Sequence, residues 1–243
     1  MTSSLSATTP WQFDLSTPKL RTTQLCGSLT LDDPATGICQ LKWKNVAVEG
    51  SILGISADES GTPREAFTRG TDLVAVYTAA GPPSFNWQVY WRANQRDSGV
   101  VLLDTILSLQ TDLLESFPSV TTRSQLAANE ALLVCADGAT KELDPPLFGT
   151  DPIEDCDCLV LRSTSSDWSY AEMTHPLDQC TLQLTRSEQG LVSVRRKLGG
   201  SFLERGVIRR MRIRGAFLPR ESDLERAAEL FTELATELPP LTA

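Results

Sequence analysis

Glu172, His175 and Asp178 are spaced Glu-x-x-His-x-x-Asp, and His175 is the only histidine in the chain. A carboxylate and an imidazole held close together can exchange protons with a hydroxyl group such as that of a sugar. This stretch therefore makes Glu172 and His175 candidate catalytic residues. The alternative interpretation is that a histidine directly before Pro176 lies in a turn and has a structural role.

A second candidate site is the aromatic run over residues 85–92, Phe-Asn-Trp-Gln-Val-Tyr-Trp-Arg. Successive side chains of a strand point to opposite faces, so Trp87 lies on one face and Tyr90 and Arg92 on the other. An aromatic ring can stack on a sugar while amide and guanidinium groups bind its hydroxyls. Trp87, Tyr90 and Arg92 are therefore candidate ligand-binding residues. In the alternative interpretation, one face is core and the other is ordinary solvent-facing surface.

The third candidate site is basic. Arg210, Arg212 and Arg214 share one face of a predicted strand, and Arg195 lies on the preceding predicted strand. If these two strands pair, the four guanidinium groups could bind a carboxylate or a phosphate. Like charges in a row repel one another unless a negative group answers them. That group is either a ligand, such as a uronic acid, or a set of carboxylates on neighbouring strands.

The charge distribution limits the partners. The net charge is −9, yet residues 186–226 carry +6 and the remainder −15. A nucleic-acid-binding protein needs surplus Lys and Arg, so we expect no nucleic acid and favour a carbohydrate or small acidic ligand. No phosphate loop, dinucleotide fingerprint or EF-hand pattern occurs, so no cofactor and no metal are predicted. No secretory signal and no membrane span are apparent, and we expect a cytoplasmic protein with six reduced cysteines.

Short strands and recurring turns dominate the sequence after residue 20. Such a pattern is typical of a large antiparallel sandwich and not of alternating strands and helices. We predict one mainly β domain over residues 1–243, with a flexible N-terminal segment over 1–20. The predicted strands are 24–31, 38–48, 50–56, 72–78, 85–93, 100–110, 111–125, 129–136, 157–163, 180–186, 190–198 and 206–218.

One amphipathic helix is predicted over residues 222–238. Ser222 and Glu225 have the spacing of a capping box, and Pro239 follows the helix. Apolar side chains fall on one stripe at helical spacing, with glutamates on the opposite side. We expect this helix to pack on the sheet through the apolar stripe, which consists of Leu224, Ala227, Ala228, Phe231, Leu234 and Leu238.

The run of strands, the aromatic strand and the Glu-x-x-His-x-x-Asp stretch together resemble the galactose mutarotase-like, or supersandwich, superfamily. That superfamily contains sugar epimerases and carbohydrate-processing sandwich domains. The resemblance implies a supersandwich-like fold and would make Glu172 the catalytic base. The epimerases use further histidines, whereas this chain has His175 alone.

Two classes of function remain open. One is a carbohydrate-binding or carbohydrate-modifying sandwich, and the other is a non-catalytic protein-interaction domain or a homo-oligomeric structural protein. The two classes differ in where the candidate residues should lie. Convergence of Tyr90, Arg92, Glu172 and His175 on one concave face favours the first class, and a flat, convex or buried arrangement favours the second.

Overall fold

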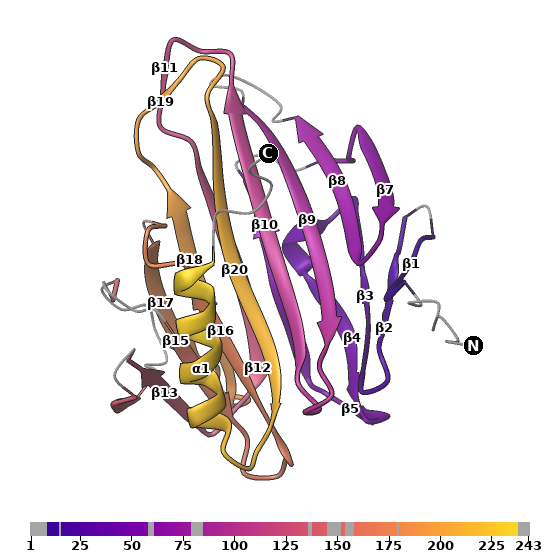
Figure 1. Cartoon of the computed structure of the whole chain (residues 1–243), viewed down its shortest axis with the longest axis vertical. Helices are drawn as coiled ribbons and strands as arrows, with labels where there is room; N and C mark the ends of the chain where they lie inside the picture. The colour runs from indigo at the N-terminus through magenta and orange to yellow at the C-terminus, as the bar shows by residue number, and fades with distance from the viewer. Residues whose placement is uncertain are drawn as a thin grey trace, which may run out of the picture.

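The computed structural model describes residues 9–14, 16–57, 61–78, 85–135, 138–144, 152–153, 158–178 and 180–237. In this part of the chain, two nine-stranded antiparallel sheets pack face to face, and one helix follows near the C-terminus (Figure 1). The predicted mainly β antiparallel sandwich with one C-terminal helix is therefore confirmed. No helix among the described residues is long and apolar enough to cross a bilayer.

The first sheet has the strand order β1-β2-β3-β4-β6-β12-β18-β17, with β5 paired to β4. Its strands are β1 Trp11–Gln12, β2 Lys19–Arg21, β3 Leu25–Leu29, β4 Ile38–Trp43, β5 Val46–Ala47, β6 Gly50–Ser56, β12 Ser119–Ala127, β17 Cys180–Arg186 and β18 Leu191–Gly199. A short 3-10 turn, η1 Pro34–Thr36, precedes β4. The predicted hairpin that joins residues 180–186 to 190–198 is β17–β18.

The second sheet has the strand order β14-β13-β15-β16-β20-β10-β9-β8-β7. Its strands are β7 Glu65–Arg69, β8 Asp72–Thr78, β9 Phe85–Gln95, β10 Val101–Thr111, β13 Glu130–Val134, β14 Thr140–Leu143, β15 Cys158–Arg162, β16 Trp168–Thr174 and β20 Ile208–Pro219. At one end of the molecule, β11 Glu115–Ser116 pairs with β19 Leu203–Glu204 in a separate two-stranded sheet.

The main core lies between the two large sheets and is continuous from β1 to β20. It contains the inward-facing aromatic side chains of both sheets, including Trp43 and Phe217, whose ring centroids are 5.6 Å apart. Sheets that bury one face in this way place alternate residues inside, which is why period-two patterning found most of the strands.

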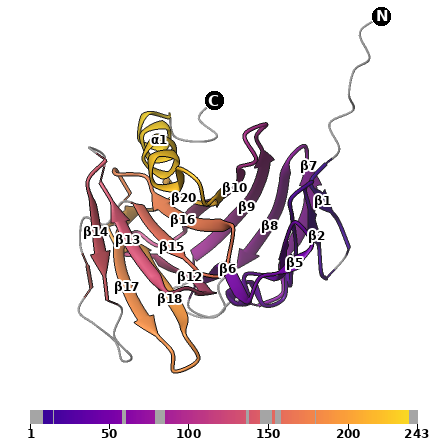
Figure 2. The same cartoon turned by 90° about the horizontal axis from the view of Figure 1, so that it is seen from below.

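Helix α1, Asp223–Thr236, covers the outer face of the second sheet. Figure 2 shows it over β20 and β16, on the side away from β12 and β18. Ala227, Leu230, Phe231 and Leu234 are buried there in a second apolar cluster. The predicted stripe is thus confirmed for the described residues, and Leu230 belongs to it as well. Leu238, predicted as its last member, lies outside the described residues.

Charged side chains hold both ends of α1. Arg162 Nε donates to Asp223 Oδ2 at 2.9 Å, and Ser169 Oγ also donates to that carboxylate. At the other end, Glu237 accepts hydrogen bonds from Arg212 and Arg214. The first turn of the helix is therefore fixed through the side chain of Asp223 and not through a capping residue.

Several predictions about local structure are wrong. Ser222 does not cap the helix with its side chain, because its backbone is left-handed with φ 57° and Asp223 makes the anchoring contacts instead. The segment predicted to be flexible over residues 1–20 contains β1 and the start of β2, and Trp11 is buried in the main core. Strand β16 was not predicted: all seven of its residues are buried, yet one of them is Glu172, a charged side chain that is rare inside a core strand.

We expect the docking of α1 to weaken in acid. Burial opposes ionisation of Asp223 and Glu237, but the arginine contacts outweigh it and hold the pKa of each carboxyl below its usual range. The resulting stabilisation is complete above the unfolded-state pKa of about 4 and is lost as the pH falls through the folded-state values. The urea midpoint should therefore fall below about pH 4. Because Asp223→Asn removes one titrating group, its midpoint should depend less on pH; an unchanged slope would contradict this account.

Candidate functional site

The structure separates the residues that the sequence grouped. Tyr90, Arg92, Arg210, Arg212 and Arg214 lie on the outer face of the second sheet, as their strand registers require. The remaining candidates lie elsewhere: Trp87 in the main core, Glu172 between the sheets, His175 in a turn and Arg195 on the outer face of the first sheet. Tyr90, Arg92, Glu172 and His175 do not converge on one concave face, so these four residues do not form the carbohydrate site that such convergence would have favoured.

Glu172 lies in a buried polar cluster between the two sheets. Its side chain accepts a hydrogen bond from Arg196 Nε at 3.0 Å, and Arg196 Nη2 donates to its backbone carbonyl at 2.9 Å. Ser124 Oγ and Tyr170 Oη donate to the other carboxylate oxygen at 2.5 and 3.0 Å. Glu172 is 1% exposed and Arg196 0%. A substrate in solvent cannot reach this carboxylate, so its position fits a structural role.

His175 follows the end of β16, in the turn that the alternative interpretation anticipated. Its Nδ1 accepts a hydrogen bond from the Leu177 amide at 3.1 Å, and its carbonyl accepts the Asp178 amide at 2.9 Å. Asp178 accepts the Arg212 amide at 2.9 Å, and burial raises the pKa of its carboxyl. The Glu-x-x-His-x-x-Asp stretch is therefore spread over a buried strand and a surface turn, without the catalytic pair that its spacing suggested.

The aromatic strand β9 is divided by its alternation. Trp87 stacks on Tyr77 in the core, with ring centroids 4.1 Å apart. Tyr90 is 8% exposed on the outer face, where Arg69 lies 5.8 Å from its ring centroid and its hydroxyl donates to Gln88 at 3.0 Å. Only a small part of the Tyr90 ring is open to a ligand.

Arginines on the outer face of the second sheet form ion pairs with carboxylates of the protein. Asp72, Arg92, Asp104 and Arg214 are register partners across four adjacent strands and form a row of alternating charge. Arg92 Nε lies 2.7 Å from Asp72 Oδ1, and Arg214 Nε lies 2.6 Å from Asp104 Oδ1. Of the two alternatives that the sequence left open, a ligand or carboxylates on neighbouring strands, the structure shows the second for these arginines.

Glu237 completes this arrangement from α1. It forms ion pairs with Arg212 and, at 3.0 Å, with Arg214. Arg212 Nη2 also donates to the Leu234 carbonyl at 3.2 Å. Arg212 and Arg214 are 5% and 3% exposed, so they are not an open anion site. Arg210 lies on the same face, half-buried opposite Ser108.

Arg195 does not join these arginines, because β18 and β20 belong to different sheets. The predicted pairing of the two basic strands is therefore wrong. The connection between them, residues 200–207, crosses from the first sheet to the second at the end of the molecule, where β19 pairs with β11. A short loop in sequence is here a crossover and not a hairpin turn.

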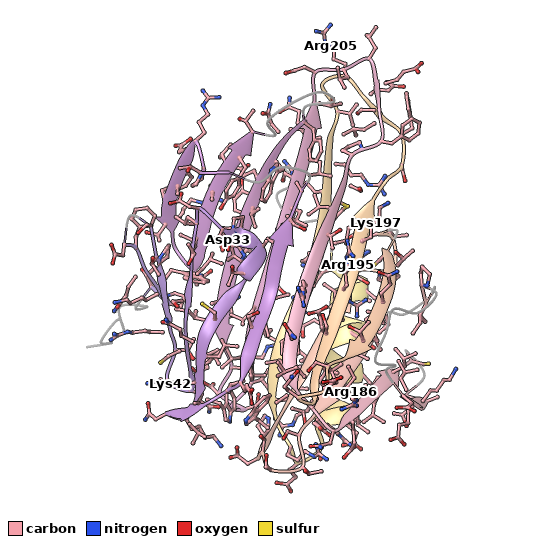
Figure 3. The ribbon with its side chains drawn as sticks, turned by 180° about the vertical axis from the view of Figure 1, so that it is seen from behind. Asp33, Lys42, Arg186, Arg195, Lys197 and Arg205 are labelled. Carbon is pink, nitrogen blue, oxygen red and sulfur yellow. The ribbon has the colours of Figure 1, made fainter. Side chains whose placement is uncertain are left out.

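Arg195 instead lines a hollow of about 450 Å³ on the outer face of the first sheet. Figure 3 views this face and labels Arg195 and Lys197 on the same strand. We call it the polar hollow, and its described lining consists of Ala35, Gly54, Ser56, Thr121, Arg123, Gln183, Thr185, Ser193 and Arg195. Apart from Ala35 and Gly54, these side chains are hydroxyls, an amide and two guanidinium groups.

The two arginines that line the polar hollow, and Lys197 beside it, have no carboxylate partners among the described residues. Arg123 and Arg195 are direct register partners on β12 and β18, and Lys197 is two residues along β18. All three are exposed, and none forms an ion pair within the described part of the chain. Like charges directly opposite one another on a sheet are destabilising. An anion placed between them would remove that repulsion.

Hydrogen bonds hold Arg123 in position on one side of the polar hollow, and η1 packs closely against β6 on the other side. Arg123 Nε donates to Ser193 Oγ at 3.2 Å, and its Nη2 donates to Gln125 Oε1 at 3.3 Å. On the other side, Gly54 allows η1 to approach, since a Cβ there would lie 2.2 Å from the Ala35 carbonyl oxygen. The guanidinium group is thus held in position, and η1 rests against the strand that borders it.

Sequence reasoning missed Arg123 and Gln183. The available signal was period-two alternation: Thr121, Arg123 and Gln125 share one face of β12, as Ser193, Arg195 and Lys197 share one face of β18. Polar faces of this kind are common on exposed sheets, and only the register shows that they adjoin.

Comparison with known proteins identifies the fold. No protein-family model and no curated protein match the sequence. Among solved structures, a GalM/aldose epimerase homologue from C. elegans matches with a TM-score of 0.50 at 10% identity, over 82% of this chain and 97% of that one. The chain therefore has a galactose mutarotase-like fold.

Two larger proteins contain a similar unit. Heparan sulfate lyase HepC from Pedobacter heparinus matches with a TM-score of 0.50 at 8% identity, over 85% of this chain and 36% of the lyase. The GH36 α-galactosidase AgaB from Geobacillus stearothermophilus matches with a TM-score of 0.50 at 5% identity, over 86% of this chain and 41% of the galactosidase. The chain thus spans less than half of either protein.

We expect the buried Glu172–Arg196 pair to be required for stability. Arg196→Met leaves a buried carboxylate without its cation, which should lower the free energy of unfolding by about 3–5 kcal/mol. The double variant Glu172→Met/Arg196→Met should lose less than the single variant, because no charge is left unpaired. Urea unfolding measures both, with Arg195→Met as the neighbouring exposed control. A single variant as stable as the control would contradict the prediction.

We expect Arg212→Met to act on stability, because it removes a hydrogen-bonded ion pair with Glu237 and a bond to α1. Hydrogen bonds to charged groups contribute about 1.5–3 kcal/mol each, so the melting temperature should fall by several degrees. Thermal unfolding followed by circular dichroism measures the change. An unchanged melting temperature would show that these contacts do not hold the helix.

Proposed function

We propose that the chain binds a carbohydrate carrying an anionic group, such as a uronic acid, in the polar hollow, and that it binds this ligand without transforming it. The observation that carries the proposal is the juxtaposition of Arg123 and Arg195, opposite each other in a hollow of about 450 Å³. The galactose mutarotase-like fold, shared at low identity with carbohydrate-active proteins, is consistent with it.

The charge of the hollow favours an anion over a neutral sugar. The whole chain carries −9, yet the described lining of the hollow contains cations and no carboxylate. Guanidinium groups bind carboxylate, sulfate and phosphate through paired hydrogen bonds, and Arg123 is already held in position for this. A neutral sugar would not neutralise the repulsion between Arg123 and Arg195.

The remaining lining groups suit the hydroxyls of a sugar. Gln183 supplies both a donor and an acceptor, and the hydroxyls of Thr121, Thr185 and Ser193 can act as either. These side chains are short, so they leave space above the sheet between the longer arginines. The volume of the hollow lies in the range of about 300–1,000 Å³ that small-molecule sites occupy.

The same lining favours binding over catalysis. Acid–base chemistry on a sugar needs a carboxylate or an imidazole within hydrogen-bond reach of the reacting hydroxyl. The described lining of the hollow includes neither. Glu172 and His175, the candidates for that role, lie in the buried cluster and in the β16 turn, so we now propose them as structural residues.

We expect galacturonate to stabilise the protein against heat and galactose not to, at matched ionic strength. A ligand at about 100 times its Kd adds about 2.7 kcal/mol to the stability of the folded state. For a chain of this size the melting temperature should rise by roughly 5–10 °C. Differential scanning fluorimetry measures the rise, and isothermal titration calorimetry measures the affinity. Arg123→Met and Arg195→Met should each abolish the rise without lowering the stability of the unliganded protein.

The matched control is Lys42→Met, which removes an exposed cation elsewhere on the first sheet (Figure 3). This variant should respond to galacturonate like the unaltered protein. The panel extends to glucuronate, a sulfated hexosamine and a hexose phosphate. The proposal is overturned if none of these ligands stabilises the protein, or if the arginine variants respond as the control does.

A further inference from the structure

Exposed apolar side chains gather at one end of the molecule. The two crossovers between the sheets, β10 to β12 and β18 to β20, meet there and form a tip (Figure 1). Of the ten large apolar side chains that are exposed in the described part of the chain, six lie on this tip. We call them the apolar tip: Leu113, Leu114, Phe117, Phe202, Val207 and Ile208.

The apolar tip is an ordered surface. Beneath it β11 pairs with β19, and Ser116 Oγ donates to the Leu203 carbonyl at 3.2 Å. Leu203 is buried, while the rings of Phe117 and Phe202 lie above with centroids 5.9 Å apart. Phe117 is 66% exposed and Leu114 76%. Exposed apolar side chains gathered at one end of a molecule in this way indicate an interaction site.

The charges around the apolar tip are unbalanced within one copy. Glu115 and Glu204 are direct register partners, which sets two carboxylates side by side. Neither they nor Arg205 forms an ion pair among the described residues. Arg205 follows Glu204 in the turn and is exposed, so it is directed to solvent beside a pair of acids that it does not neutralise.

We propose that the apolar tip is a homodimer interface, in which two copies of the chain meet tip to tip about a two-fold axis. In such an isologous contact the same patch faces itself, and a two-fold axis that passes between Arg205 and the Glu115–Glu204 pair sets Arg205 of each copy opposite the two acids of the other. The apolar side chains are then covered, and each Glu115–Glu204 pair has a positive charge from the other copy beside it. A lipid surface fits less well, because the two carboxylates would be carried toward the bilayer.

The interface is small, which sets the expected strength. Stable interfaces bury about 800 Å² on each partner, and six partly exposed side chains supply less than that. We therefore expect a weak, concentration-dependent dimer. The polar hollow lies away from the tip, as the positions of Arg195 and Arg205 in Figure 3 show, so the dimer leaves it open.

Sedimentation velocity over a concentration series tests the proposal. The weight-average mass should rise from 26.6 kDa toward twice that value. Phe117→Asp should keep the protein at the monomer mass, and Phe67→Asp, which alters an exposed apolar residue on β7, should not. A monomer at every concentration, or a dimer that survives Phe117→Asp, overturns the proposal. Vesicle binding by a chain that stays monomeric also overturns it.

Charge reversal tests the pairing across the two-fold axis. Arg205→Glu alone and the double variant Glu115→Arg/Glu204→Arg alone should both stay monomeric, because each copy then faces its own charge. An equimolar mixture of the two should form a heterodimer, in which every contact pairs opposite charges. Circular dichroism melts confirm that each variant is folded. A mixture that stays monomeric overturns the proposal.

Discussion

A single ion pair between the two sheets constrains much of this molecule. Arg196 on β18 and Glu172 on β16 are both withdrawn from water, and a charge in such a place is tolerated only with its partner present. Ser124 extends the cluster, since it donates to Glu172 and accepts the Leu53 amide at the bulge of β6. Burial also raises the pKa of Tyr170, so its phenol stays protonated and able to donate.

The same ion pair decides what the outer face of the first sheet presents. Because a strand alternates its side chains, an inward Arg196 forces Arg195 and Lys197 outward. Ser124 likewise faces inward and leaves Arg123 outward on the neighbouring strand. The polar hollow is thus the reverse side of the buried cluster. The residues that form the buried cluster therefore also determine which charged side chains lie on the outer face of the first sheet.

Arginines of β20 are paired with carboxylates, whereas Arg195, which faces outward on β18, has no carboxylate partner among the described residues, because the two strands have different neighbours. Strand β20 runs between β10 and β16, where Asp104 and the end of α1 supply carboxylates to its arginines. Strand β18 runs between β12 and β17, whose outward residues near Arg195 are Arg123 and Gln183. One set of arginines therefore stabilises the fold, while the other remains available to a ligand.

The sequence by itself determined the class of fold, most of the strands and the helix, because period-two and period-3.6 patterning are local consequences of burying one face. It failed at β16, where the charged Glu172 occupies a buried position, and at Ser222, where contacts of Asp223 override a capping pattern. The position of the candidate site was decided by the tertiary structure alone. Whether an outward arginine meets a carboxylate or another arginine depends on which strands are neighbours, and that pairing joins residues as distant in sequence as Arg123 and Arg195.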